Sequence, residues 1–328
     1  MYYIYIIVRR AARIGECSMY RLGIDLGGTH IAAGVVDEEN RIVSAKSIPT
    51  VSKNGVAALL DDIAACAKDA AAGSGLSMSD FVGVGIGVPG ICDTQRGVVR
   101  YAHNIGWDAI PVSEELKQRL GLPVVFANDA DCAALGEVIA GAAKGCDGAL
   151  MITLGTGVGG GFIVDGRIWS GHHGLGGEFG HMCIQPGGAP CSCGRSGCWE
   201  AYASATALIR QAQEAAQAHP DSLLNRMQPL SGKKIFAAAA EGDAAAQAVT
   251  AQYAVYVGVG LVNFINILFP EVVLIGGGMC NAGDALLDPV RAYVKGHTYV
   301  EDAVQLPEIR AAALGSNAGV IGAAALVC

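Results

Sequence analysis

The chain carries one short pattern twice, and this repetition limits the folds open to it. The stretch LGIDLGGTHIAAGVVD (Leu22–Asp37) aligns without gaps on LMITLGTGVGGGFIVD (Leu150–Asp165), and six of the sixteen positions are identical. Each copy consists of an apolar stretch, a glycine turn and a second apolar stretch, which is typical of a β-hairpin. Because a pattern repeated at this separation indicates two similar halves, we expect two related α/β units.

The second copy also matches the dinucleotide-binding fingerprint, with glycines at 155, 157 and 160. That fingerprint must open a helix, because the helix N-terminus holds the pyrophosphate. Here strand and turn residues follow instead, at Phe162–Val164, Gly166 and Ile168–Trp169. The hairpin is therefore the favoured interpretation.

Both glycine turns can leave room for an anion beside the backbone. Glycine permits unusual φ angles and lets a phosphate approach the backbone N–H groups, and Thr29 adds a hydroxyl donor. Taken alone, Gly-Gly is also an ordinary hairpin turn. The candidate phosphate-binding residues are Gly27, Gly28 and Thr29 in the first copy and Gly155, Thr156 and Gly157 in the second.

Residues 177–200 concentrate metal-binding side chains in a segment rich in Gly and Pro. His181, Cys191, Cys193 and Cys198 follow the spacing H-x9-C-x-C-x4-C. Three thiolates and one imidazole are the ligand set of a closed tetrahedral zinc site, although packing or redox thiols are an alternative. Glu178 and Glu200 flank the ligands, where a structural zinc would hold both carboxylates as rigid acceptors for hydroxyl groups.

The motif GExGH followed by CxCGxxGCxE resembles the ROK family of bacterial sugar kinases and repressors. The resemblance implies that the His and the three Cys bind zinc, that Glu178, His181 and Glu200 contact sugar hydroxyls, and that Cys183 is a packing thiol. It also implies an α/β fold of the actin-like ATPase (ribonuclease H-like) class. In that fold two similar domains face each other across a cleft, and the hairpin turns hold the nucleotide phosphates.

A carboxylate stands at the end of a short buried strand. Val124–Phe126 leads to Ala127-Asn128-Asp129, and a helix follows from about Ala130 to Ala140. Folds of the α/β class place chemistry at this point, but taken alone the favoured interpretation is that Asp129 or Asp131 caps the helix. The resemblance assigns Asp129 as the catalytic base, with Asp131 as an ordinary helix residue.

Phosphoryl transfer needs phosphate donors, Mg2+, a positioned hydroxyl and a base. Asp25, next to the first turn, can organise Mg2+ through water. Gly276, Gly277 and Gly278 follow the apolar strand Val272–Ile275 and match the adenosine-side motif of the family, although a close strand-to-helix turn explains them as well. The expected sugar contacts are Gly90, Asn104, Asn128, Glu178, His181 and Glu200.

We therefore expect attack of a hexose 6-OH on the γ-phosphate of ATP. The stretch CGRSGCWEAYASATAL looks most like the glucokinases of the family, and N-acetylmannosamine, fructose and allose kinases share most contacts. The repressors of the family carry an N-terminal DNA-binding domain. Here twenty-four residues precede Asp25, and they contain no basic helix pair.

Composition and net charge limit the classes of partner that the protein can be expected to bind. The net charge is −8 and the pI is near 5.3, which argues against a nucleic-acid or anionic-membrane surface. The long apolar stretch Asp243–Phe269 is interpreted as a buried helix. The chain has eleven Cys, and those outside the proposed ligand set are scattered, which suits a reducing cytoplasm rather than a disulfide framework. We expect a cytoplasmic homodimer or homotetramer.

The expected organisation is a leader at 1–18 before a start at Met19, an N-terminal domain of residues 19–131 plus 309–328, and a larger C-terminal domain of residues 132–308. The remaining helices are expected at Gly55–Ala72, Ser113–Leu120 with Ser113 as N-cap, Ser204–His219, Ile235–Ala240, Asp288–Val294 with Asp288 as N-cap, and Gly315–Val327, which by the resemblance crosses back to the first domain.

Overall fold

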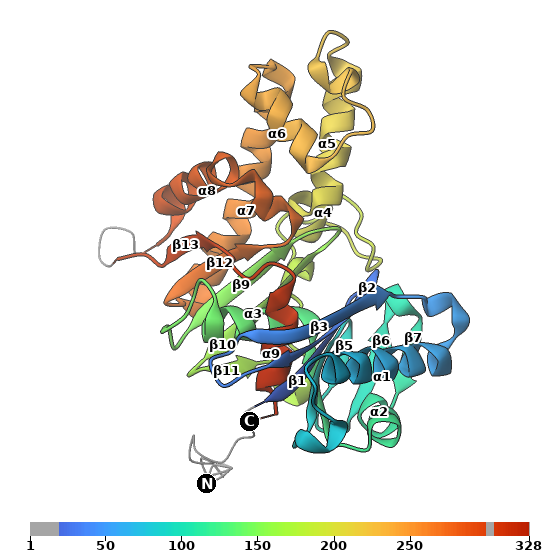
Figure 1. Ribbon diagram of the computed structural model, residues 1–328. Helices are drawn as coiled ribbons and strands as arrows, with labels where there is room; N and C mark the ends of the chain where they lie inside the picture. Colours follow the sequence, from blue (N-terminus) through green and yellow to red (C-terminus); the bar gives the residue numbers. More distant parts are fainter. Residues whose placement is uncertain (1–19, 300–304, 328) are drawn as a thin grey trace.

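The computed structural model describes residues 20–299 and 305–327, so the leader lies outside the described residues. Two lobes each contain a five-stranded sheet (Figure 1), in the orders β3-β2-β1-β4-β8 and β11-β10-β9-β12-β13. The first sheet comprises β1 (Arg21–Leu26), β2 (His30–Val36), β3 (Ile42–Pro49), β4 (Val84–Val88) and β8 (Val124–Asn128). The second comprises β9 (Ala149–Leu154), β10 (Val158–Val164), β11 (Arg167–Trp169), β12 (Val272–Gly276) and β13 (Glu308–Ala311).

The two copies of the repeat form equivalent hairpins. β1 pairs antiparallel with β2, and β9 pairs antiparallel with β10. In each sheet the first hairpin strand also pairs in parallel with a later strand, β4 or β12. The two hairpins and the parallel strand beside each have the same order and the same relative directions in both sheets, which confirms the prediction of two similar halves. The structure also excludes the dinucleotide fingerprint, since the second turn opens the strand β10 instead of a helix.

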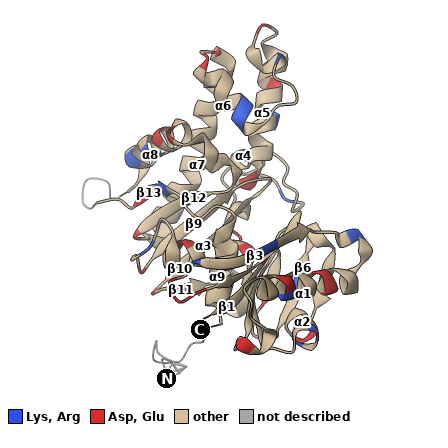
Figure 2. Cartoon of the chain, in the orientation of Figure 1, with Lys and Arg blue, Asp and Glu red and all other residues tan. Residues whose placement is uncertain are grey.

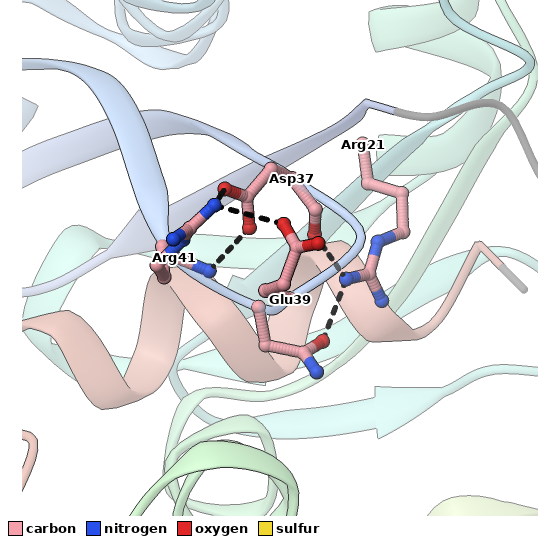
Figure 3. A network of polar contacts seen from close by, with 5 residues as sticks. Arg21, Asp37, Glu39 and Arg41 are labelled. Atoms are coloured by element: carbon pink, nitrogen blue, oxygen red, sulfur yellow. Dashed lines mark hydrogen bonds and ion pairs between the residues drawn. The ribbon is translucent and has the colours of Figure 1, made fainter.

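The turn after the first hairpin is held by charged side chains (Figure 3). Arg21 donates to the Asp37 carbonyl oxygen at 2.9 Å and to Asn40 Oδ1 at 2.6 Å. Arg41 binds the Asp37 carboxylate at 2.8 Å and Glu39 at 2.9 Å. These contacts fix the passage from β2 to β3, where the register shifts after Val35.

A third, smaller sheet was not expected from the sequence. It consists of β5 (Ile91–Asp93), β6 (Val98–Ala102) and β7 (Trp107–Ile110). The prediction of a loop between Tyr101 and Pro111 was therefore wrong for Trp107, which starts β7 and is 1% exposed. Burial of this large side chain against the first lobe's core stabilises the strand. Asn104 lies in the short turn between β6 and β7.

Helices cover both sheets (Figure 1). Two predicted helix starts were wrong. The helix at Val112 is preceded by Pro111 and has no side-chain cap, so Ser113 is not its N-cap. The helix predicted from Asp288 begins at Asp284, directly after Gly283, whose positive φ breaks the chain there, so Pro289 lies within the helix. The helices are α1 (Val56–Gly73), α2 (Val112–Leu120), α3 (Asp129–Ala140), α4 (Glu200–Ala203), α5 (Ala205–Ala218), α6 (Gly232–Ala240), α7 (Ala244–Leu268), α8 (Asp284–His297) and α9 (Asn317–Ala325).

The last helix returns to the first sheet, as the resemblance implied. A Cβ atom at Gly23 on β1 would overlap the carbonyl oxygen of Val320 on α9, and one at Gly85 on β4 would overlap that of Ala323. Only glycine allows backbones to come this close. β13, however, pairs with β12 in the second sheet. We therefore propose to move the domain boundary, expected at 309, to the segment after Ala311.

A buried carboxylate connects the end of α3 with the segment before α9, where the chain passes between the lobes. Glu137 on α3 is 0% exposed. One of its oxygens accepts from the Ala313 and Leu314 backbone N–H groups at 2.9 and 2.7 Å, and the other accepts from Ala142 N at 2.7 Å. Charge-assisted bonds of this kind are among the stronger hydrogen bonds in proteins. Glu137 thus holds the segment before α9 against the end of α3.

Helix α7 is long and apolar enough, by length and composition alone, to cross a membrane. Its residues belong instead to the core of the second lobe, where Tyr253, Val257 and Leu261 are fully buried. The Tyr253 hydroxyl donates to the Ala203 carbonyl oxygen at 2.7 Å. The prediction of a buried helix at this position is confirmed.

Candidate active site

The end of β8 and the start of α3 bring Asn128 and Asp129 to the edge of the first sheet. Asn128 is the N-cap of α3, and its Oδ1 accepts from Ala130 N at 2.9 Å. The Asn128 amide also donates to the Gly90 carbonyl oxygen at 3.1 Å. Because Asn128 caps the helix, the Asp129 carboxylate is not needed for capping, although its Oδ1 also lies 2.9 Å from Ala130 N.

Four of the predicted site residues line one small cavity. Its volume is about 90 Å³, and Gly90, Asn128, Asp129 and Glu178 lie in its wall. Gly90 has a φ of +91°, and a Cβ there would overlap the Tyr101 carbonyl oxygen, so this turn requires glycine. The other lining residues are Ile91, Ala130, Asp131, Gly159, Gly160, Gly174, Gly176 and Gly177. We call this space the inner cavity.

The inner cavity is strongly acidic. Burial, and in addition the charge of Glu178, raises the pKa of Asp129, while backbone hydrogen bonds oppose the rise. Burial and the charge of Asp129 raise the pKa of Asp25 to about 7. A general base near the working pH needs a raised carboxyl pKa of this kind. The site can therefore accept a proton from a bound hydroxyl.

The predicted zinc ligands converge. The ligand atoms of His181, Cys191, Cys193 and Cys198 all lie within 4.8 Å of one another. Cys193 Sγ is 3.6 Å from Cys198 Sγ, and Cys191 Sγ is 3.7 Å from His181 Nδ1. Zn–S bonds of about 2.3 Å in a tetrahedral site place two sulfur atoms roughly 3.8 Å apart, so this donor set fits a zinc ion.

The loop around this donor set is anchored to the second lobe. Trp199 is fully buried, and its indole N–H donates to the Tyr256 carbonyl oxygen on α7 at 2.7 Å. Hydrogen bonds from the Arg195 backbone and side chain lower the pKa of the Cys193 thiol to about 6, which favours the thiolate. Cys183 is exposed, so its interpretation as a packing thiol was wrong.

Glu200 connects the loop that carries the donor set, residues 181–198, to the second glycine turn. Its Oε2 accepts from Val158 N at 3.0 Å, and its Oε1 accepts from Ser192 Oγ at 3.1 Å. Glu200 lines a second cavity of about 420 Å³, the outer cavity, together with Asn104, Thr156 and Gly157. The structure thus divides the predicted sugar contacts, with Glu178 at the inner cavity and Asn104 and Glu200 at the outer one.

A methyl group at Gly157 should disturb this connection. A Cβ there would overlap Glu200 Oε2. We expect Gly157→Ala to raise the KM for ATP at least about tenfold, which corresponds to ~1.4 kcal/mol, because the turn must shift. Steady-state kinetics with varied ATP checks this, with Gly296→Ala in α8 as the control, because a Cβ there would meet no atom within 4 Å. An unchanged KM in the Gly157 variant would contradict the role assigned to this turn.

The three glycine turns lie close to the outer cavity or to one another. A Cβ at Gly28 would lie 3.7 Å from Asn104 Cβ, so the first turn, Gly27–Thr29, adjoins the outer cavity. The start of α5 holds the second turn, since Ala205 N donates to the Gly155 carbonyl oxygen and Thr206 Oγ1 donates to that of Thr156, both at 2.8 Å. In the third turn, Gly276–Gly278, a Cβ at Gly277 would contact the Leu154 backbone just before the second turn.

Sequence reasoning missed some residues of the inner cavity. Asp131 was interpreted as an ordinary helix residue, but it is buried in the cavity wall. The loop WSGHHGLGG contributes Gly174, Gly176 and Gly177, and its His173 is bonded to Gln95 at 3.0 Å. The density of glycine directly before Glu178 is a signal that could have indicated this close approach.

The profile of the ROK family matches residues 21–328, and the chain belongs to this family. The chain is 41% identical over 313 residues to a glucokinase of Halalkalibacterium halodurans, covering 93% of this chain and 94% of that one. A solved ROK glucokinase of Streptomyces griseus, in complex with glucose and AMPPNP, has a TM-score of 0.80 and 39% identity, covering 94% and 98%. A xylose repressor of Bacillus subtilis is 28% identical over 94% of this chain and 77% of its own length.

Proposed function

We propose that the protein is an ATP-dependent glucokinase that transfers the γ-phosphate of ATP to the 6-OH of glucose. The observation that carries this proposal is the acidic inner cavity, where Asp129 stands beside Asn128, Gly90 and Glu178. Relatives at about 40% identity over nearly the whole chain are glucokinases, which supports ATP and glucose as the two substrates. The overall fold of a solved glucokinase supports the same reaction.

In this proposal Asp129 takes the proton of the attacking hydroxyl as the new O–P bond forms. Asn128, Glu178 and Gly90 hold the sugar from the inner cavity, and Asn104, Glu200 and His181 hold it from the side of the zinc loop. The turns at Gly27–Thr29 and Gly155–Gly157 bind the phosphates, and Gly276–Gly278 lies on the adenosine side. Catalysis of phosphoryl transfer consists mainly of such positioning and charge stabilisation.

Two metal ions belong to the proposal. Zinc on His181 and the three cysteines would fix the His181 ring, leaving its second nitrogen free to face the sugar. Asp25 is a carboxylate beside the first turn, which is the kind of oxygen ligand that Mg2+ prefers. Mg2+, when bound with ATP, would neutralise the phosphate charge. The protein's own residues supply the orientation and the base.

A coupled ADP-release assay tests the function. With Mg-ATP and a panel of glucose, mannose, fructose, allose, N-acetylglucosamine and N-acetylmannosamine, we expect the highest kcat/KM with glucose. A hydroxyl-binding site typically rejects an analogue that leaves its buried polar groups unpaired. Preference for an N-acetyl sugar would move the substrate to the N-acetylmannosamine kinases of the family. Absence of ADP release with every sugar would instead favour a sugar-responsive regulator.

The surface agrees with a small-molecule enzyme. Figure 2 shows Lys and Arg scattered among Asp and Glu in this view, and the net charge is −8. A nucleic-acid surface typically gathers basic residues on one face. We propose that the enzyme works in the cytoplasm as a homodimer or homotetramer, without a nucleic-acid or membrane partner. Size-exclusion chromatography with light scattering measures the oligomeric state.

A further inference from the structure

Asp131 is a buried acid to which the proposed reaction gives no role. It lies two residues after Asp129 in the first turn of α3, in the wall of the inner cavity. The side chain is 4% exposed, and its Oδ1 has no hydrogen-bond partner. Ionising a carboxylate in such a place costs on the order of several kcal/mol. A buried acid without hydrogen-bond donors therefore keeps its proton at pH values where an exposed aspartate has lost it.

The groups that face Asp131 do not favour its charged form. The charges of Asp129 on the same helix and of Glu178 from the opposite lobe both act on it, and no cation among the described residues forms an ion pair with it. The thiols of Cys132 on α3 and of Cys92 on β5 lie in the same surroundings, together with Asp25 on β1. Every one of these neighbours is either negative or neutral.

The acids of the inner cavity do not form a compact set of side-chain metal ligands. Among residues 20–299 and 305–327, the one group whose metal-ligand atoms lie within 4.8 Å of one another is the zinc set around His181. Asp129, Asp131 and Glu178 are not gathered in that way. A proton, which needs no such ligand set, can neutralise Asp131.

The two acids on α3 differ in their hydrogen bonds. Asp129 is partly exposed, and its Oδ1 lies 2.9 Å from the backbone N–H of Ala130, which stabilises the ionised form. Asp131 Oδ1 has no such donor. A carboxyl group that accepts a backbone hydrogen bond ionises more readily than a buried one whose oxygen has no donor. The proton of the pair thus stays on Asp131 while Asp129 is free to act.

We infer that Asp131 is a positioning residue for the phosphoryl transfer, which remains protonated so that, of the pair Asp129 and Asp131, only Asp129 carries the charge needed for base catalysis. This inference rests on the proposed function. Burial, and then the charges of Asp129 and Glu178, raises the pKa of Asp131 to about 7. Above that pH Asp131 adds its negative charge to those of Asp129 and Glu178 in the inner cavity and opposes the approach of the γ-phosphate, so activity falls on the alkaline side.

Protonation of Asp131 also makes the free energy of unfolding depend on pH, and it predicts lower stability at higher pH. The pKa of Asp131 is raised in the folded state, so the unfolded chain releases this proton at lower pH than the folded chain does. The folded state is therefore penalised progressively as the pH rises from about 4 to about 7, and the full penalty persists above that. Below pH 4 both states hold the proton, and the penalty vanishes.

Asp131→Asn tests the inference, because asparagine has the shape of the neutral acid. We expect the variant to keep at least about one third of the wild-type kcat at pH 6.5. The acid limb of its pH–activity profile should match that of the wild type, and its alkaline limb should lie about one pH unit higher. We also expect the difference in Tm between variant and wild type to widen from pH 4 to 7 and then level off. Asp108→Asn, an exposed acid on β7, is the control and should behave as wild type.

Two results would overturn the inference. One is a more than tenfold loss of kcat at pH 6.5 in a folded variant, which would mean that the carboxyl group itself is used. The other is an alkaline limb of the pH–activity profile that is the same in the variant and the wild type, together with a difference in Tm between them that does not depend on pH. Asp131→Ser replaces the Asn variant if the latter does not fold. If the wild type phosphorylates no sugar, the proposed function fails, and the Tm comparison still shows whether Asp131 holds a proton.

Discussion

Asp129→Asn is expected to lose about 10²- to 10⁴-fold in kcat, the usual contribution of a general base. The substitution keeps the shape of the side chain but removes its ability to take the proton of the sugar hydroxyl. The N-cap of α3 is Asn128, so the helix should remain intact. Glucose affinity should change by less than about fivefold, because Asn128, Gly90 and Glu178 still line the cavity.

The measurements are kcat by coupled ADP release and glucose binding by isothermal titration calorimetry. Asp221→Asn, an exposed acid in the loop after α5, is the control. In the wild type the raised pKa of Asp129 should place the acid limb of kcat/KM above the ordinary range of an aspartate, since the base works only when ionised. A variant with more than a tenth of the wild-type kcat would exclude Asp129 as the base.

Cys198→Ser is expected to lose the zinc ion and with it both stability and sugar affinity. Cys198 is 1% exposed and lies within the converging donor set. Loss of a structural metal belongs to the changes that cost on the order of 4 kcal/mol or more. Without the ion, the His181 ring and the Glu200 side chain lose their common support, so we expect the Kd for glucose to rise more than tenfold.

The loop also provides a matched control. Cys183→Ser removes an exposed thiol that lies outside the donor set. We expect it to retain one zinc per chain, the wild-type Tm and the wild-type glucose Kd. Metal content by elemental analysis, Tm by calorimetry and glucose Kd by titration separate the two variants. Stoichiometric zinc or normal glucose binding in Cys198→Ser would refute the coupling between metal and substrate.

The sequence predicted those features of the fold that depend on local pattern. The two hairpins and the helix at α7 follow from apolar periodicity, and the donor set around His181 follows from spacing in a glycine-rich loop. The start of α8 was misplaced because Asp288-Pro289 is a good local start signal, whereas Gly283 one turn earlier is where the chain changes direction. Local preference was overridden there by the connection to the preceding turn.

The features that were missed depend on contacts between distant segments. Trp107 is in a strand because its ring is buried against the first lobe's core, which no local pattern shows. The buried state of Asp131 depends on β10 and the Gly174–Gly177 loop, both far along the chain. The separation of Glu178 from Glu200 likewise arises from the bond between Glu200 and the second hairpin.

The return of α9 has a consequence for synthesis of the protein in the cell. β1 and β4 leave the ribosome well before the helix that covers Gly23 and Gly85, because that helix follows the second lobe in the chain. At a translation rate of about 5–20 residues per second, this face of the sheet stays uncovered for on the order of tens of seconds before α9 is made. During that interval the nascent N-terminal lobe lacks the packing of one face of its sheet, so it cannot complete its folding until α9 has been made.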